Sequence, residues 1–167
     1  MPSEALARVA GGRKLDLDRF LPYRLSVLTN HVSHAIAHRY SVRFGLGVHE
    51  WRVMAVLGQN SGLSARELAL RTAMDKVQVS RAVTRLVRQK RVQRHPDATD
   101  GRITRLCLTS RGHAIYDEVV PMALNLEDAF LAALTPEERV QLDCLVGKLT
   151  CQVRLIGAAL PLPGRLE

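Results

Sequence analysis

The chain has 167 residues, of which 47% are hydrophobic and 24% charged, which is the composition of a globular protein with room for one domain. No apolar run approaches the ~20 residues of a membrane-spanning helix, residues 1–12 lack a secretory signal, and three cysteines are an odd number for a disulfide framework, so we expect a cytoplasmic protein. The net charge of +8, with a pI near 10.1, indicates a polyanionic partner if the basic residues are concentrated in one place.

The first two predicted elements are helices that follow an irregular start. Residues 1–17 mix glycines and charges without periodicity, so we expect a mobile tail. Pro22 suits the first turn of a helix, and apolar residues then recur at helical spacing until Gly45 ends the pattern. A shorter helix is predicted over about residues 50–59, although no Ser or Thr stands at its start to cap it.

Two further helix starts follow in quick succession, and both have the capping-box pattern. Ser64 precedes Glu67 by three residues, and Asp75 precedes Gln78 by the same spacing. In this pattern each side chain satisfies a backbone amide that the helix leaves free. The result is a helix-turn-helix in outline. Its two helices are predicted over about residues 65–71 and 76–90.

A hairpin and two long helices are predicted after the helix-turn-helix. The strand-like runs 92–95 and 103–109 flank an Asp-Gly pair, which favours a hairpin. A helical pattern returns over about residues 113–134, with a bend expected near Pro121. The last helix begins with a cap, a first-turn proline and a capping-box acid. These residues are Thr135, Pro136 and Glu138.

Positive charge is concentrated around the helix-turn-helix and the hairpin. Residues 75–111 contain ten Lys or Arg and three Asp, so the rest of the chain is close to neutral. The segment has no aromatic side chain to stack on single-stranded bases, and we therefore expect duplex DNA as the partner. A solvated basic face is the alternative.

The helix predicted over residues 76–90 has an apolar stripe and a polar stripe. A helix about 10 Å across fits the major groove, where Gln and Arg bind base edges while Ser and Thr reach phosphates. A solvated amphipathic helix is the alternative. The reading surface is expected to comprise Gln78, Ser80, Arg81 and Thr84.

Several stretches of the sequence resemble the MarR family of winged-helix transcriptional regulators. They are Ser-Ala-Arg-Glu-Leu-Ala at 64–69, Val-Ser-Arg-Ala-Val-Thr-Arg-Leu at 79–86, the wing Arg-His-Pro-Asp-Ala-Thr-Asp-Gly-Arg at 94–102, and the Leu-x-Leu-Thr-x-x-Gly exit at 106–112. The resemblance implies a mainly α fold with a small β-hairpin, in which a winged helix-turn-helix domain carries long dimerisation helices.

The same resemblance implies a homodimer on an inverted-repeat operator, because two recognition helices about one DNA turn apart require two-fold symmetry. An intramolecular core helix is the alternative for the apolar stripe of the last helix. The implied segments are a tail over 1–17, a dimerisation helix over 18–48, the DNA-binding lobe over 49–112, C-terminal dimerisation helices over 113–158, and a tail over 159–167.

At the wing, the resemblance implies that Arg102 enters the minor groove and that Asp100 holds the wing or this arginine through a salt bridge. The chain departs from the family where Lys90-Arg91-Val92 replaces the usual Gly-Leu-Val, so the glycine C-cap is absent. Lys90 and Arg91 could add phosphate contacts or be solvated. The candidate DNA contacts are Ser64, Lys76, Gln78, Ser80, Arg81, Thr84, Arg85, Arg88, Arg94, Asp100 and Arg102.

MarR-like proteins commonly bind a small, often aromatic and anionic effector between the dimerisation helices and the DNA-binding lobe. The resemblance therefore implies a repressor that such a molecule releases from DNA. Cationic and aromatic side chains would suit a carboxylate or phenolate, although each is also compatible with packing or surface exposure. The candidates are His38, Arg39, Tyr40, His49, Trp51, Arg52 and Tyr116.

The sequence also contains features that bear on metal binding, other DNA-binding roles and catalysis. His31, His34 and His38 could share a helix face and bind zinc, but no Cys, Asp or Glu accompanies them nearby, and we expect no metal or cofactor. Cys144 and Cys151 are expected to be buried as small apolar residues. A nonspecific architectural DNA-binding protein is a further alternative. An enzyme is not expected, because the chain has no phosphate loop, nucleophile elbow or metal-hydrolase histidine pair.

Overall fold

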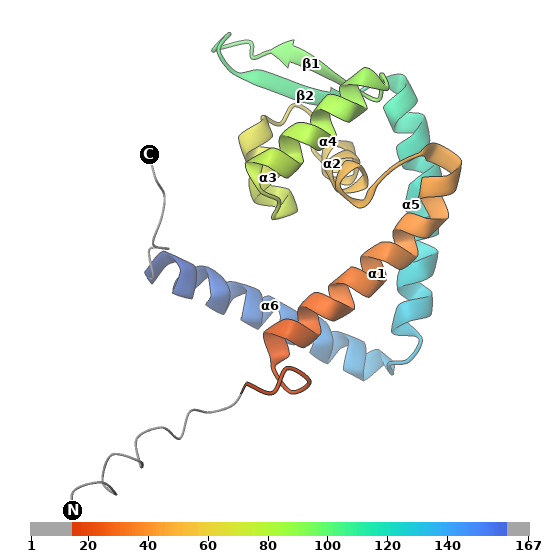
Figure 1. Ribbon diagram of the computed structural model, residues 1–167, viewed down its shortest axis with the longest axis vertical. Coiled ribbons are helices and arrows are strands. Elements are labelled where there is room, and N and C mark those ends of the chain that lie inside the picture. Colours follow the sequence, from red (N-terminus) through yellow and green to blue (C-terminus); the bar gives the residue numbers. More distant parts are fainter. Residues whose placement is uncertain (1–14, 160–167) are drawn as a thin grey trace, which may run out of the picture. The chain divides into compact units, whose positions relative to one another are not determined.

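The computed structural model describes residues 15–159, which form six helices and one two-stranded antiparallel sheet (Figure 1). The order of helices and strands confirms the predicted fold class. Residues 1–14 and 160–167 of the expected tails lie outside the described residues. The elements are α1 (Leu21–Phe44), α2 (Val48–Gln59), α3 (Ala65–Thr72), α4 (Lys76–Arg88), β1 (Val92–Pro96), β2 (Thr104–Leu108), α5 (Ser110–Leu131) and α6 (Pro136–Ala159).

Side-chain caps fix the starts of the short helices, as the sequence predicted. The Ser64 hydroxyl accepts from the Glu67 amide at 3.3 Å, and the Asp75 carboxylate accepts from the Gln78 amide at 2.7 Å. α2 begins at Val48, two residues before the predicted start, because the Glu50 carboxylate accepts a hydrogen bond from the Gly47 amide. This contact is the Glu half of a capping box, whereas Gly47 has no side chain that could accept from the Glu50 amide.

The predicted apolar stripe of α4 forms the centre of the core. Val79, Ala82, Val83 and Leu86 are at most 3% exposed. They belong to one apolar cluster with side chains of α2, α3 and the hairpin, so the stripe anchors α4 and leaves its opposite face outward. Other members that are at most 2% exposed include Val53, Met54, Leu57, Leu68, Val92 and Leu106.

The hairpin is attached to the helix-turn-helix through the backbone. Its register runs from Val92 opposite Leu108 to Pro96 opposite Thr104. Leu106 donates to the Leu63 carbonyl at 2.9 Å and accepts from the Gly62 amide at 3.0 Å. The residues that lead into α3 therefore form an isolated β-bridge with β2, which holds the wing beside the helix-turn-helix.

The chain divides into two compact units, one ending at Val120 and the other beginning at Pro121, and α5 runs through the boundary as one helix. In the second unit, every side chain of α6 described through Gly157 is exposed. Cys144 and Cys151 are therefore exposed, and the expectation that they are buried is wrong for the single chain. No helix in the described range is long and apolar enough to cross a membrane.

The junction between α4 and β1 forms without a glycine at the C-terminal end of the helix. Lys90 adopts φ +58°, the left-handed conformation that glycine favours, and the backbone still turns into β1. Arg91 is only 6% exposed, and its guanidinium donates to the Phe44 carbonyl at the end of α1. Burial lowers the pKa of Arg91. The suggestion that Arg91 adds a phosphate contact is therefore wrong, because its side chain points into the protein.

Replacing Lys90 by glycine is expected to stabilise the protein. A left-handed L-residue costs about 1–2 kcal/mol, and the extra freedom of glycine in the unfolded chain offsets part of the gain, so the free energy of unfolding should rise by about 0.5–1 kcal/mol. Lys90→Ala is the matched control, since it removes the same side chain and keeps the strained conformation. Urea unfolding of both variants measures the difference, and equal stabilities would contradict the assignment.

Candidate nucleic-acid interface

The outward face of α4 lies opposite its buried stripe. Residues three and four positions apart share one side of a helix, so Val77, Arg81, Thr84 and Arg88 follow one another along the middle of this face. All four are exposed, and Ser80 is exposed beside them. Three of the four expected reading residues, Ser80, Arg81 and Thr84, are thus brought together on one accessible surface.

Two other candidates on α4 are engaged by the protein itself. Gln78 is half-buried at the edge of the outward face, where its side-chain oxygen accepts from the Asp75 amide at 3.4 Å. Arg85 is on the same edge and lies 3.3 Å from the Glu50 carboxylate, whose side chain is 10% exposed. Ser64 is similarly occupied, because its hydroxyl donates to Glu67 at 2.7 Å. These three side chains are less free than the sequence suggested.

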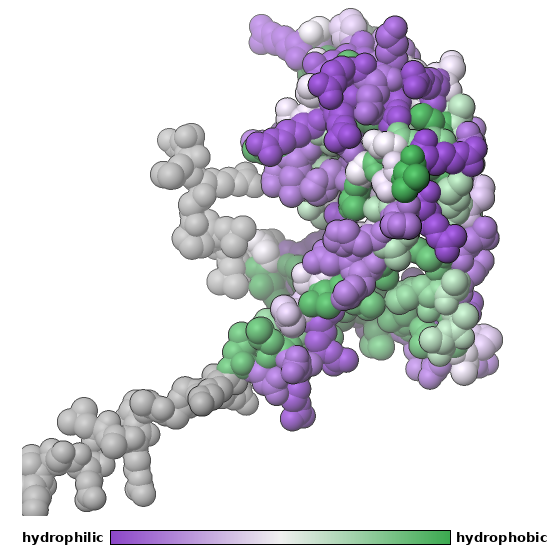
Figure 2. Space-filling view, turned by 45° about the vertical axis from the view of Figure 1, so that its right-hand side comes forward, coloured by the Kyte–Doolittle hydropathy of each residue, from purple (hydrophilic) through white to green (hydrophobic). Residues whose placement is uncertain are grey.

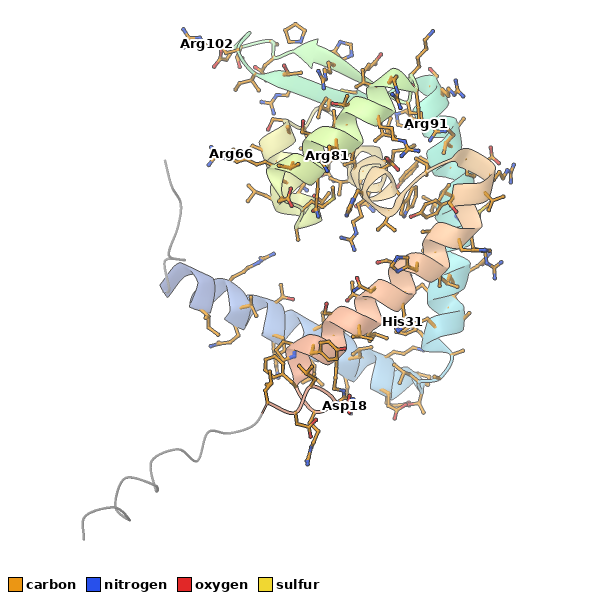
Figure 3. The ribbon with its side chains drawn as sticks, viewed as in Figure 1. Asp18, His31, Arg66, Arg81, Arg91 and Arg102 are labelled. Atoms are coloured by element: carbon orange, nitrogen blue, oxygen red, sulfur yellow. The ribbon has the colours of Figure 1, made fainter. Side chains whose placement is uncertain are left out.

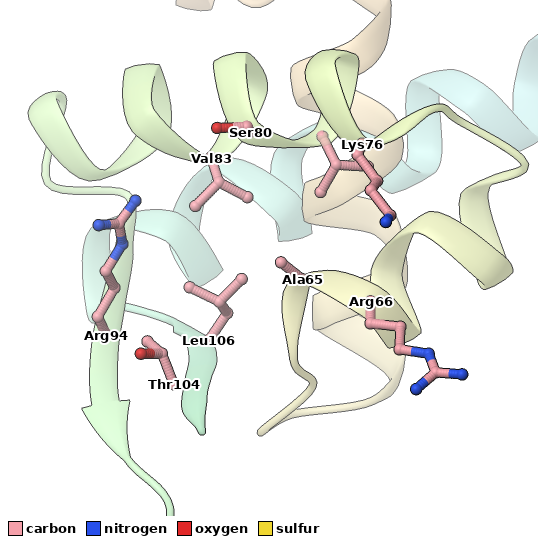
Figure 4. A pocket seen from close by; sticks show the side chains of 9 residues that line it. Ala65, Arg66, Lys76, Ser80, Val83, Arg94, Thr104 and Leu106 are labelled. Atoms are coloured by element: carbon pink, nitrogen blue, oxygen red, sulfur yellow. The ribbon is translucent and has the colours of Figure 1, made fainter. Parts of the chain in front are cut away.

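A groove of about 320 Å³ separates α4 from the first turn of α3 and the hairpin. Figure 4 shows Lys76 and Arg94 at its two ends, with Val83 and Leu106 between them. Arg66 also lines the groove. Arg66 was not among the predicted contacts, although an arginine two positions after a helix cap is a recognisable signal for an exposed cation at a helix start.

Asp97 organises the wing loop. Its carboxylate accepts from the Thr99 amide at 2.9 Å, the Thr99 hydroxyl at 2.6 Å and the Asp100 amide at 3.1 Å, and it pairs with Arg105 at 2.5 Å. These hydrogen bonds, led by those from Thr99, hold the pKa of Asp97 well below its usual range. The four contacts give the loop one preferred shape.

In the structure, Asp100 forms a hydrogen bond with the backbone in place of the expected salt bridge. Its carboxylate accepts from the Arg102 backbone amide at 3.0 Å, and no ion pair of Asp100 is present in the described part of the chain. The wing's ion pair belongs to Asp97 and Arg105 instead. The difference has a geometric reason, since Asp100 lies in the loop two residues from Arg102, whereas Asp97 and Arg105 approach from the two strand ends.

Arg105 ties the wing to the start of α3. Its guanidinium lies 2.9 Å from the Glu67 carboxylate and 3.3 Å from the Gly62 carbonyl, in addition to its contact with Asp97. Asp97 raises the pKa of Arg105 through this hydrogen bond. The pKa of Glu67 is lowered, chiefly by its hydrogen bonds with Ser64. Arg105 is therefore a structural cation rather than a free one.

The remaining arginines leave a positive surface on one side of the lobe. Within residues 15–159, no carboxylate forms an ion pair with Arg66, Arg81, Arg94 or Arg102, and all four are exposed. Figure 3 shows Arg66 and Arg102 extending from the same side, Arg102 at the wing tip, with Arg91 on the other side. Most of the surface of the lobe at the top of Figure 2 is hydrophilic.

A second candidate site lies between α1 and α2. Tyr40, Trp51 and Arg52 line a cavity of about 150 Å³ together with Ser33, Ile36 and Val48. The Trp51 ring lies 5.7 Å from that of Tyr40 and 6.0 Å from that of Tyr116. Burial raises the pKa of Tyr40 to about 12. Arg52 donates to Ser33 at 3.3 Å, which places one cation at an aromatic cavity.

The other effector candidates are not brought to this cavity. His38, Arg39 and His49 are exposed, and none is among the residues that line it. The metal alternative also lacks support, since residues 15–159 hold no group of three His, Cys, Asp or Glu side chains close enough to bind an ion. The ring of His34 instead contacts the Asn30 carbonyl at 2.7 Å on its own helix.

Asp97→Asn is expected to lower stability in a pH-dependent way. Because the folded state lowers the pKa of Asp97, its carboxylate stabilises the fold fully above the unfolded value of about 3.9 and loses this contribution as the pH falls below it. The variant should therefore be less stable than wild type at pH 7, and the gap should narrow toward pH 2–3. Urea midpoints across this range provide the measurement, and a gap that is constant with pH would show that the carboxylate charge is irrelevant.

Comparisons with known proteins agree with this architecture. A sequence model of the MarR family matches residues 44–103. The transcriptional regulator BilQ from Clostridium symbiosum is 30% identical over 93 residues, which cover 56% of this chain and 65%, just under two-thirds, of BilQ. The transcriptional repressor NicR from Pseudomonas putida is 26% identical over 135 residues, which cover 77% of this chain and 85% of NicR.

A solved structure supports the same assignment along most of the chain. The MarR family transcriptional regulator SPO1453 from Silicibacter pomeroyi is 30% identical, with a TM-score of 0.67, and the match covers 81% of this chain and 98% of that protein. These relatives are transcriptional regulators rather than enzymes. Because its sequence, its winged helix-turn-helix and its fold all match, the chain belongs to the MarR family of transcriptional regulators.

Proposed function

We propose that the protein is a homodimeric, sequence-specific DNA-binding repressor of the cytoplasm. In this proposal α4 of each chain enters the major groove of an inverted-repeat operator, and the wing follows the adjacent minor groove. The observation that carries the proposal is a set of exposed arginines on one side of the lobe that form no ion pair with any carboxylate of residues 15–159. They lie at the recognition helix, at the start of α3 and along the wing.

Ser80, Arg81 and Thr84 are the proposed reading residues of the recognition helix. Arginine can bind guanine through two hydrogen bonds, and the hydroxyls can contact bases or phosphates. Lys76, Arg66 and Arg94, which line the groove beside α4, are well placed to neutralise phosphates. Arg88 extends the same face toward the C-terminal end of the helix.

Arg102 is the proposed minor-groove residue. It is exposed at the wing tip, and its backbone amide is fixed by Asp100. The loop that presents it is ordered by Asp97 and tied to α3 by Arg105. A narrow A·T-rich minor groove concentrates negative potential, so an arginine held at this position would contribute affinity and some recognition of DNA shape.

Exposed apolar side chains support dimerisation through helices outside the recognition surface. On α1, Leu21, Leu25 and Leu28 are 45–47% exposed. On α6, apolar side chains at helical spacing are exposed as well. Surfaces of this kind mark protein interfaces, because water solvates contiguous apolar area poorly. The exposed residues of α6 that form this stripe include Leu142, Leu145, Leu149 and Val153.

The repressor and effector parts of the proposal rest on relatives and on the aromatic cavity. NicR is named a repressor. Solved structures of this fold include a complex of MepR from Staphylococcus aureus with DNA. They also include BpsR from Bordetella bronchiseptica, whose DNA binding is regulated by 6-hydroxynicotinic acid. The cavity at Tyr40, Trp51 and Arg52 suits an aromatic acid of this kind. Such a molecule would release DNA only if it prefers the conformation that DNA disfavours.

Arg102→Ala is expected to weaken operator binding about tenfold and to reduce the slope of log affinity against log salt by about 1. The probe is a duplex selected by the wild-type protein from genomic DNA, titrated by fluorescence anisotropy at several salt concentrations. Arg139→Ala, which removes an exposed arginine from α6, is the matched control and should leave both quantities unchanged.

The same titration tests the proposal as a whole. The selected duplex should bind at least ~10³ times more tightly than random DNA, with two chains per duplex. Equal affinity for both DNAs would favour a nonspecific architectural protein. One chain per duplex would contradict the symmetric dimer, and no salt-sensitive binding to any duplex would overturn the function.

Binding of an aromatic acid is expected to change the fluorescence of Trp51, the single tryptophan of the chain. Isothermal titration with 6-hydroxynicotinate, other aromatic acids and their thioesters identifies a ligand, and Arg52→Ala should weaken its binding about tenfold by removing a charge-assisted contact. Arg39→Ala is the matched control, because Arg39 is exposed away from the cavity lining. If none of these compounds binds or releases DNA, the effector assignment fails.

A further inference from the structure

Val77 is an apolar side chain on the outward face of α4. It is 57% exposed, and it is the one large apolar residue of this helix that the structure leaves exposed. The buried apolar residues of α4 follow the stripe that begins at Val79, and Val77 falls outside that spacing. The core therefore does not account for a valine at this position.

The position of Val77 on the helix is specific. It lies on the first turn of α4, two residues after the Asp75 cap, and one helical turn before Arg81 on the same face. It is not among the residues that line the groove between α4 and the hairpin. Val77 thus points away from the protein, in the middle of the face that carries Arg81, Thr84 and Arg88.

The chemistry of a DNA base edge supplies a partner for such a side chain. In helix-turn-helix proteins, the N-terminal residues of the recognition helix contact base edges in the major groove. Most groups at these edges are hydrogen-bond donors or acceptors, which a valine cannot satisfy. The 5-methyl group of thymine is the apolar exception, and it is contacted by apolar side chains.

We propose that Val77 is a specificity-determining residue that selects a thymine in each half-site by packing against its 5-methyl group. This inference rests on the proposed function, since it requires α4 to lie in the major groove. It adds a contact of a different kind to those of Ser80, Arg81 and Thr84, because a methyl contact discriminates thymine from cytosine and uracil without a hydrogen bond.

Replacing thymine by deoxyuridine tests the proposal directly, because this removes the methyl group and keeps base pairing. The probe is the consensus duplex that the wild-type chain selects from a randomised library, with each thymine of one half-site replaced in turn. At one position, the wild-type protein should bind the uracil duplex about fourfold more weakly, the effect of one buried methyl-sized group. Val77→Ala should bind the parent duplex more weakly and should show less than half of this uracil effect at that position.

Val42→Ala is the matched control, since it truncates an equally apolar, 84% exposed valine on α1 and should retain the full uracil effect. Circular dichroism confirms that both variants are folded. The proposal is overturned if no thymine position responds to uracil, or if Val77→Ala responds as wild type does. In those cases, a selected consensus with salt-sensitive binding leaves the proposed function intact, whereas a library that yields no consensus overturns both.

Discussion

The packing of α4 onto its own lobe is the constraint on which the interface depends. Val79, Val83 and Leu86 are almost completely buried, and each such burial contributes about 1.5–3 kcal/mol. This stripe fixes the rotation of the helix about its axis and thereby decides which side chains point outward. A rotation by one residue, about 100°, would carry Ser80 or Arg81 into the core, at the cost of an unpaired buried polar group.

Internal ion pairs and hydrogen bonds decide how much of the positive charge remains for a polyanion. Arg85, Arg91 and Arg105 are each held by other groups of the same chain. The ten basic residues of segment 75–111 therefore overstate its free charge, whereas Arg66 adds a cation from outside the segment. Net charge indicates the class of partner, but the partners of each arginine set the number of phosphates that the surface can neutralise.

Local signals in the sequence were sufficient for most of the fold. The capping boxes at Ser64 and Asp75 and the Asp-Gly pair of the wing involve neighbours in the chain, and each element appeared within a few residues of its predicted place. The site was less predictable because its contacts join distant residues. Arg105 meets Glu67 across 38 positions and Arg91 meets Phe44 across 47, and no spacing rule reveals such pairs.

The proposed contact with a second chain uses the apolar surfaces of α1 and α6, whereas the proposed contact with DNA uses other elements. Leu57, Leu68 and Leu86 of the winged lobe belong to one buried cluster that forms within the single chain. α6 exposes its apolar stripe along the described helix, and an amphipathic helix gains most of its stability by burying that face. In the proposed dimer, the helices that bury these stripes would set the distance between the two recognition helices. An effector bound at the cavity between α1 and α2 could then weaken DNA binding by changing this distance, without touching α4.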